Sequence, residues 1–326
     1  MKNTSRKRGV FGTILFMSQI RVGILRGGAG ESYRSSLQKG GEIISYILEN
    51  LGDKYKTSDI LVDRNHIWHF GGVPINPGDL VHKIDLAWNI SHSSLSNVLE
   101  SLSIPNIGTG SFASTLENSR DMLRAHMKGI GVNMPRHIIL PLYQKDFDGP
   151  RERYAIKKAK GVFEKFGSPW IVKSFNPDSH MGIHLAQTFN DLADAIEDGV
   201  SHGESILVEE FISNKNASVH SVADFRGQDV YVFPLGNSFG NLPAQAGFSP
   251  DEKEKLINLA KDLHKHIGAR HYLKTDFVLN PRGKIYLLSI ESTPNLKPNS
   301  HFHQVCESVG AKMHQVVEHI LGQALD

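Results

Sequence analysis

Apolar and polar positions follow two different periods along the chain, and these periods predict an alternation of strands and helices. Continuous apolar runs at Ile20–Leu25, Pro169–Lys173 and Ser205–Ile212 are typical of buried strands. The segments Asn190–Gly199 and Leu256–Ile267 place apolar side chains at every third or fourth position, which predicts amphipathic helices. Because the two kinds of segment alternate, we expect an α/β protein.

Other segments extend the alternation. Val81–Ile90 predicts a strand, and Ser111–Met134 predicts a single helix that ends before Pro135. Ala217–Phe233 predicts a hairpin that turns at Arg226-Gly227-Gln228. Phe302–Leu321 predicts a closing helix.

These elements predict three lobes. We expect an N-terminal βαβ domain over 17–110, a central lobe over 111–205 and a C-terminal lobe over 206–326. Residues 1–16 join a basic stretch to a short apolar run without a small-residue cleavage site, so we do not expect them to form a secretory signal. We expect a leader there, or translation that starts at Met17.

Composition excludes several kinds of partner. The 326 residues are 40% hydrophobic and 21% charged, and the formal net charge is only +2. Such balance favours neither nucleic acid nor a membrane surface as a partner, and no apolar run reaches the ~20 residues that a membrane-spanning helix needs. The single cysteine, Cys306, predicts a buried thiol in a reducing compartment, and thus a cytoplasmic protein.

The segment Tyr272–Glu291 carries the most specific chemistry. Two alternating strands flank the tight-turn sequence Asn280-Pro281-Arg282-Gly283. If Asn280 pairs with Gly283, then Asp276 faces Leu287 and Lys274 faces Ser289.

That register places Lys274, Asp276, Ser289 and Glu291 on one face of the hairpin. Mg²⁺ prefers oxygen ligands and usually takes one or two carboxylates plus substrate phosphates. The face therefore predicts a magnesium site. A solvated face with ordinary charges is the alternative.

Two other strands suggest a nucleotide site. The strand that ends at Lys173 runs into the polar loop Asn176–Gly182, which could place an ammonium and a loop of small residues beside phosphates. The strand Ile206–Ile212 could bind an adenine through its backbone. Each segment alone is equally compatible with an ordinary core strand.

Taken in order, the motifs resemble those of the ATP-grasp superfamily, and within it the D-alanine–D-alanine ligases. The matching segments are Gly27-Gly28 with Ser36-Leu37, Ile104–Thr109, Pro169–Gly182, Leu207–Ile212, Thr275–Phe277 and Ile290–Pro294. The resemblance implies an N-terminal βαβ domain and a nucleotide site between the central and C-terminal lobes.

The resemblance also implies a role for individual residues. ATP would contact Arg120, Lys173, Glu209, Glu210, Ile212 and Asn216. Mg²⁺, or Mn²⁺ in its place, would be held by Asp276, Ser289 and Glu291. Lys274 and Ser179 would assist catalysis, and the substrates would meet Glu31, Ser32 and Ser300.

Departures from the family pattern fall mainly on the substrate side. The family has an acidic signature where this chain has Leu86–Ser93, which contains no acidic residue, and Ser32 replaces the glutamate that binds the first substrate's ammonium. The adjacent Glu31 could restore that carboxylate. On the metal strand, Ser289 stands at the family's glutamate and Glu291 at its asparagine, so the number of carboxylates is unchanged.

The resemblance implies an ATP-dependent carboxylate–amine ligase that acts through an acylphosphate on a small amino acid or carboxylate, with an altered substrate site. The alternative is an ATP-binding regulator without ligase activity. A dehydrogenase is disfavoured, because Gly27-Gly28-x-Gly30 lacks the complete dinucleotide fingerprint. The resemblance also suggests a homodimer.

Overall fold

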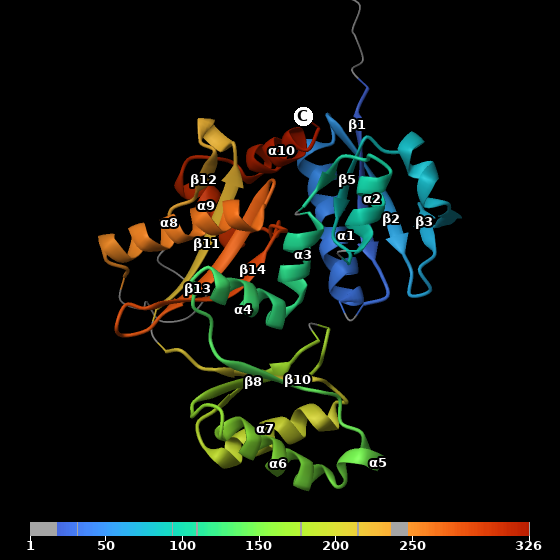
Figure 1. The fold of residues 1–326 in the computed structure, drawn as a ribbon. Helices are drawn as coiled ribbons and strands as arrows, with labels where there is room; N and C mark the ends of the chain where they lie inside the picture. Colours follow the sequence, from blue (N-terminus) through green and yellow to red (C-terminus); the bar gives the residue numbers. More distant parts are fainter. Residues whose placement is uncertain are drawn as a thin grey trace, which may run out of the picture.

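The computed structural model arranges the chain around three β-sheets (Figure 1). It describes residues 18–30, 32–92, 94–108, 110–176, 178–213, 215–235 and 247–325. Helices cover each sheet, so the predicted α/β class is confirmed. The expected leader and start at Met17 lie outside the described residues. In that described part, no helix is both long and apolar enough to cross a membrane.

The N-terminal sheet has the strand order β4-β3-β2-β1-β5-β6. Its strands are β1 (Ile20–Gly27), β2 (Tyr55–Val62), β3 (Trp68–Phe70), β4 (Val73–Ile75), β5 (Leu86–Asn89) and β6 (Asn106–Ile107). The helices beside it are α1 (Tyr33–Leu51), η1 (Pro77–His82) and α2 (Ser94–Ser101). The single strand predicted over Val81–Ile90 is wrong: Pro77 and the capping side chain of Asn76 start a 3-10 turn, and only Leu86–Asn89 is extended.

The central sheet has the antiparallel order β7-β10-β8-β9 and forms the separate lower lobe in Figure 1. Its strands are β7 (His137–Leu140), β8 (Trp170–Ser174), β9 (His184–Ala186) and β10 (Ile206–Glu210). The helices α5 (Lys145–Asp148), α6 (Arg151–Phe163) and α7 (Phe189–Ser201) accompany it. Because β10 is in this sheet, the central sheet extends beyond the boundary expected at 205.

The C-terminal sheet has the order β12-β11-β13-β14. Its strands are β11 (Lys215–Ala223), β12 (Val230–Val232), β13 (Tyr272–Leu279) and β14 (Ile285–Glu291), with η2 (Phe225–Gly227) between the first two. The helices α3 (Ser111–Asn118), α4 (Arg120–Gly129), α8 (Pro250–Ile267), α9 (His301–Ser308) and α10 (Met313–Gln323) lie in or beside this part. The hairpin predicted over Ala217–Phe233 is confirmed by the pairing of β11 with β12.

Two predicted helices are each divided in the structure. The helix expected over Ser111–Met134 breaks at Ser119, whose side chain caps α4 by accepting a hydrogen bond from the Met122 amide. Leu116 and Leu123 of the two halves pack in the core of the C-terminal sheet, although the sequence assigned them to the central lobe. The closing helix breaks at Gly310, whose φ of 67° is a left-handed conformation that glycine adopts readily.

The register of the metal hairpin differs from the predicted one. Asn280 pairs with Lys284 rather than Gly283, so Leu279 lies opposite Ile285. A bulge then inserts Leu288, which leaves Asp276 opposite Ser289 and Lys274 opposite Glu291. The longer turn and the bulge together shift the pairing by two residues, so the predicted same-face set is kept.

Candidate active site between the central and C-terminal sheets

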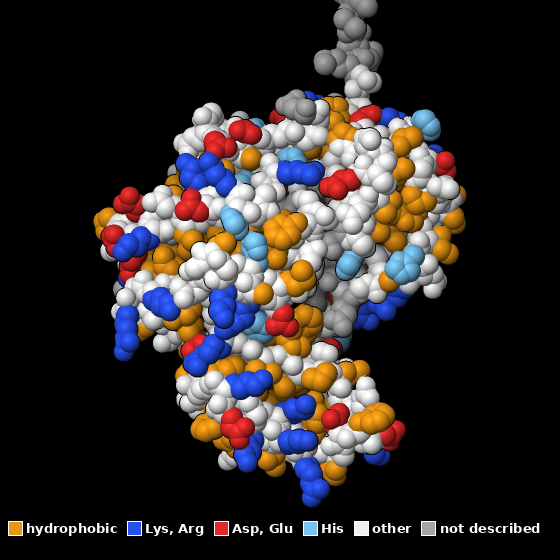
Figure 2. Space-filling view, in the orientation of Figure 1, with side chains coloured by type: hydrophobic (Ala, Val, Ile, Leu, Met, Phe, Trp, Pro, Cys, Tyr) orange, Lys and Arg blue, Asp and Glu red, His pale blue; other side chains and the backbone are white. Residues whose placement is uncertain are grey.

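A cavity of about 580 Å³ lies between the central and C-terminal sheets. Lys173 of β8 pairs with Leu207 of β10, and side chains two residues apart on a strand share a face, so Lys173, Leu207 and Glu209 all line the cavity. Arg120 enters from the start of α4. In the space-filling view the molecule narrows where the central lobe joins the rest, and blue Lys and Arg side chains gather there (Figure 2).

Lys173, Glu209 and Arg120 form what we call the basic cluster. Lys173 Nζ lies 3.0 Å from Glu209 Oε2, and the Arg120 guanidinium donates to Glu209 Oε1. Burial opposes the charge on Glu209, but Arg120 and Lys173 together hold its pKa below the ordinary value. Two cations against one carboxylate leave a net charge of +1 in the cluster.

Lys274, Asp276, Ser289 and Glu291 form what we call the hairpin face. Ser289 Oγ donates to Asp276 Oδ2 at 2.8 Å. Lys274 Nζ lies 3.0 Å from Asp276 Oδ2 and 3.1 Å from Glu291 Oε1. Burial opposes the charge on Lys274, while the two carboxylates raise its pKa above the ordinary value. These contacts confirm that the four side chains share one face.

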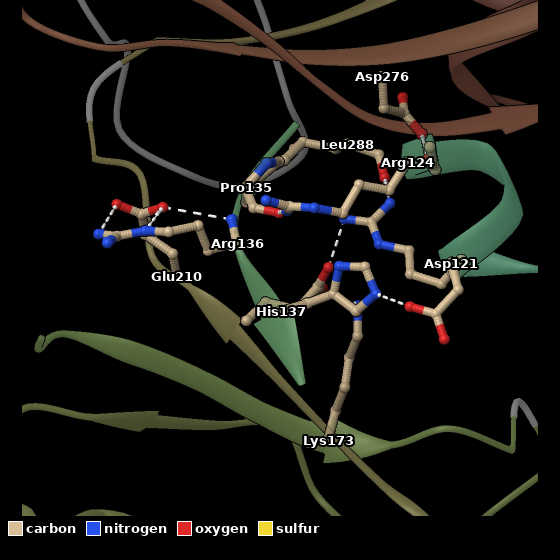
Figure 3. A network of polar contacts seen from close by, with 12 residues as sticks. Asp121, Arg124, Pro135, Arg136, His137, Lys173, Glu210, Asp276 and Leu288 are labelled. Atoms are coloured by element: carbon tan, nitrogen blue, oxygen red, sulfur yellow. Dashed lines mark hydrogen bonds and ion pairs between the residues drawn. The ribbon is translucent and has the colours of Figure 1, made fainter. Parts of the chain in front are cut away.

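The Leu288 bulge joins the two groups. Its carbonyl accepts a hydrogen bond from Arg120, while the next residue, Ser289, belongs to the hairpin face. Figure 3 shows Lys173 rising from the central sheet toward Leu288 and Asp276 of the C-terminal sheet. The basic cluster and the hairpin face are therefore parts of one site.

The donor set fits a divalent cation that is shared with phosphates. The two carboxylates of the hairpin face outweigh the Lys274 ammonium by one negative charge. Among the described residues, no group of three or more His, Cys, Asp or Glu could hold a metal by itself. Mg²⁺ usually takes one or two carboxylates and completes its shell with phosphate oxygens and water. The two carboxylates of the hairpin face are therefore enough. The buried Arg120 Nε, which has no partner in the described structure, fits an additional phosphate oxygen.

Three residues expected at the nucleotide lie away from this cluster. Glu210 pairs instead with Arg136, at 2.8 Å and 3.0 Å, and Figure 3 shows this pair set apart from Lys173. The family resemblance assigned Glu210 to the site, but neighbouring residues of a strand point to opposite faces, so Glu210 does not share the face of Glu209. Ile212 follows β10, and Asn216 lies on β11 opposite Val278. Neither lines the cavity that the described residues outline.

The expected serines have different surroundings. Ser32 lines the main cavity and an adjoining cavity of about 360 Å³. Ser179 Oγ accepts a hydrogen bond from the Met181 amide, which keeps it within its own loop. Ser300 caps α9 by accepting from the His303 amide. Glu31 lies outside the described residues.

Sequence reasoning missed several residues near the site. Glu117 of α3 lines both cavities and accepts hydrogen bonds from Ser292. Asp178, in the loop between β8 and β9, accepts from backbone amides at the start of α1. His220 and His301, each far from the other in sequence, are hydrogen-bonded at 2.8 Å. A glutamate in an amphipathic helix gives no local signal of such contacts, which tertiary structure alone creates.

Solved structures that share this fold include a D-alanyl-alanine synthetase and a D-alanine–D-alanine ligase. D-alanyl-alanine synthetase A from Vibrio cholerae matches with a TM-score of 0.69 at 19% identity, over 95% of this chain and 99% of that chain. A D-alanine–D-alanine ligase from Bacillus anthracis, complexed with ATP, matches with a TM-score of 0.66 at 17% identity, over 94% and 97%. The expected ATP-grasp architecture is thereby confirmed.

Sequence comparison defines the family. A family model described as D-ala D-ala ligase C-terminus matches residues 127–322. The curated D-alanine–D-alanine ligase of Azobacteroides pseudotrichonymphae is 22% identical over 331 residues, which cover 92% of this chain and 98% of that protein. The chain belongs to the D-alanine–D-alanine ligase family. It is an ATP-dependent ligase that uses ATP with Mg²⁺ and acts on small molecules.

Proposed function

We propose that the chain joins the carboxylate of one small amino acid to the amine of a second through an acylphosphate, with D-alanine as the first candidate for both. The observation that carries this proposal is the contact, through Arg120 and Leu288, between the basic cluster and the hairpin face. This contact places side chains that can bind phosphates, Lys173 and Arg120, next to carboxylates that can bind a metal ion. The relatives named as D-alanine ligases support the choice of substrate.

We assign the phosphate contacts to Lys173 and Arg120, and the metal contacts to Asp276, Glu291 and Ser289. When bound, Mg-ATP supplies the phosphoryl group that activates the substrate carboxylate. Phosphoryl transfer depends mostly on positioning and charge neutralisation. Lys173 and Arg120 therefore hold and neutralise phosphate oxygens. Lys274, which the two carboxylates keep protonated, balances charge that develops on the acyl oxygen.

We assign the remaining expected residues on the basis of the family pattern. Glu209 and the backbone near Ile212 would border the adenine, and Asn216 the ribose. Ser179 would assist at the reacting groups, and Ser300 would receive the carboxylate of the second amino acid. Glu210 would contribute by position only, because its side chain is bound to Arg136. We further propose a cytoplasmic homodimer.

The substitution Asp276→Asn tests this proposal. It removes one metal carboxylate but keeps the size of the side chain, and we expect Mg²⁺-dependent ATP turnover with an amino-acid panel to fall by at least ~10²-fold. Phosphate release measures the effect. Asp229→Asn is the control, because Asp229 pairs with Lys265 on an exposed surface.

Near-normal turnover in Asp276→Asn would refute the metal assignment. If the unaltered protein is stabilised by Mg-ATP but releases no phosphate with any amino acid, the chain binds nucleotide without ligation. That outcome would support the regulatory alternative.

A further inference from the structure

The adjoining cavity contains a carboxyl group that the proposed mechanism does not use. This cavity of about 360 Å³ lies between the start of α1, the end of β5 and the end of β14. Glu117, in the last turn of α3, lines both it and the main cavity. A group bound to Glu117 would thus lie between the adjoining cavity and the main cavity, which contains the phosphate-binding residues Lys173 and Arg120.

Ser292 fixes the orientation of Glu117. Glu117 Oε2 accepts hydrogen bonds from the Ser292 amide at 3.2 Å and from Ser292 Oγ at 2.6 Å. Both donors follow directly after Glu291 of the hairpin face. Because Oε2 carries both bonds, Oε1 is left for another donor.

The charge of Glu117 lacks a matching cation in the described structure. Burial is the largest influence and raises the pKa of Glu117 above the ordinary value; the bonds from Ser292 oppose this shift, and nearby Glu291 adds to it. Lys39 acts on Glu117 only at longer range, and no described residue forms an ion pair with this carboxylate. Glu117 is only partly exposed, and a desolvated carboxylate favours a cationic partner, which a ligand ammonium would provide.

We propose that Glu117 receives the ammonium group of the first substrate, an amino acid whose carboxylate accepts the phosphoryl group. This inference rests on the proposed function and assigns the first substrate's binding site. Ser32, which stands where the family has its ammonium-binding glutamate, is uncharged and lines the same cavity. Glu117 thus restores the missing charge from a different element, α3 rather than the start of α1.

The variant Glu117→Gln removes the charge but keeps an oxygen that accepts from Ser292. The probes are D-alanine and propionate, which differ by the amino group, each assayed by hydroxamate formation with ATP, Mg²⁺ and hydroxylamine as the amine. We expect kcat/KM for D-alanine to fall ~10²–10³-fold, because a site built for a polar group rejects a mismatch strongly. The value for propionate stays unchanged.

Two further variants serve as controls. Glu152→Gln alters an exposed glutamate of α6 and should change neither value. Ser292→Ala keeps the charge of Glu117 but removes its shortest hydrogen bond, and we expect a loss of about tenfold that is confined to D-alanine. This variant tests the proposal even if Glu117→Gln fails to fold.

Equal losses for both probes would show that Glu117 supports the fold or the nucleotide and would overturn the proposal. An unchanged D-alanine preference with an increased Mg²⁺ requirement would assign Glu117 to the metal and would overturn it as well. If the unaltered protein forms no hydroxamate from any acid, the proposed function itself fails, which is a distinct result.

Discussion

Glu209 shows how one side chain can prepare a site for a ligand of the same charge. It is buried, and it balances Arg120 and Lys173 until phosphates arrive. Removing one partner from a buried ion pair leaves uncompensated charge, which is far costlier than breaking an exposed pair. Glu209 therefore stabilises the unliganded protein and competes with bound phosphates for the same cations.

The variant Glu209→Gln should be less stable than the unaltered protein by about 3 kcal/mol in the absence of nucleotide. Mg-ATP should then stabilise the variant more than the unaltered protein, because its phosphates replace the missing negative charge. Thermal unfolding with and without Mg-ATP measures both effects. The matched control is Glu210→Gln, which breaks only the pair with Arg136. Equal Mg-ATP shifts in Glu209→Gln and the unaltered protein would contradict the phosphate assignment.

At the scale of elements, Asp178 joins the central lobe to the N-terminal sheet. Its carboxylate accepts from the amides of Arg34 and Ser35, at 2.6 Å and 2.8 Å, in the first turn of α1. These amides lack partners within a helix, and the helix dipole also favours an anion there. A side chain from the loop between β8 and β9 therefore caps a helix in another lobe.

The variant Asp178→Ala should lose about 1 kcal/mol, the usual worth of such a cap. If the contact holds the loop over the nucleotide, KM for ATP should also rise roughly fivefold, which is the same free energy expressed as affinity. Steady-state kinetics and denaturant unfolding measure the two effects. Asp148→Ala removes a comparable bond to the Gln144 amide inside the central lobe and should leave KM unchanged. An unaltered KM in Asp178→Ala would show that the cap is structural only.

The elements also show what the sequence could predict. Periodicity located α7, α8 and the strands of the metal hairpin, because each buries one regular face. The hairpin register could not be predicted, because one more turn residue and the Leu288 bulge leave the apolar alternation almost unchanged. Helix α6 and strand β2 were not identified at all.

The sequence could predict those site residues whose type and order along the chain match the family motifs. Lys173, Glu209 and Asp276 were identified through motif order, and the structure places them in one connected site. Glu117 could not be identified, because its contact with Ser292 spans 175 residues and Glu117 itself belongs to no motif. Contacts of this kind follow from the fold and not from local sequence.

At the scale of the whole molecule, several histidines in and beside the C-terminal sheet are shielded from water, which favours their neutral form. His264 of α8 is bonded to Ser221 Oγ of β11 at 2.8 Å, and burial lowers its pKa to about 4 from an ordinary 6.5. Burial also lowers the pKa of His220, His271 and His301. Burial of Glu117 acts in the opposite direction, since it raises the pKa of an acid.

The folded protein has its full stability with respect to His264 at pH values above the unfolded pKa of 6.5. This stability is lost as the pH falls toward the folded pKa of about 4, because the unfolded chain then binds the proton more tightly. For His264 the whole difference corresponds to roughly 3 kcal/mol. The variant His264→Gln cannot be protonated, so its free energy of unfolding should decline less between pH 7 and pH 4.5 than that of the unaltered protein. Denaturant titrations across this range measure the difference, and exposed His82→Gln is the control. If the two variants and the unaltered protein decline in parallel, acid sensitivity arises elsewhere, and the α8–β11 contact does not couple protonation to unfolding.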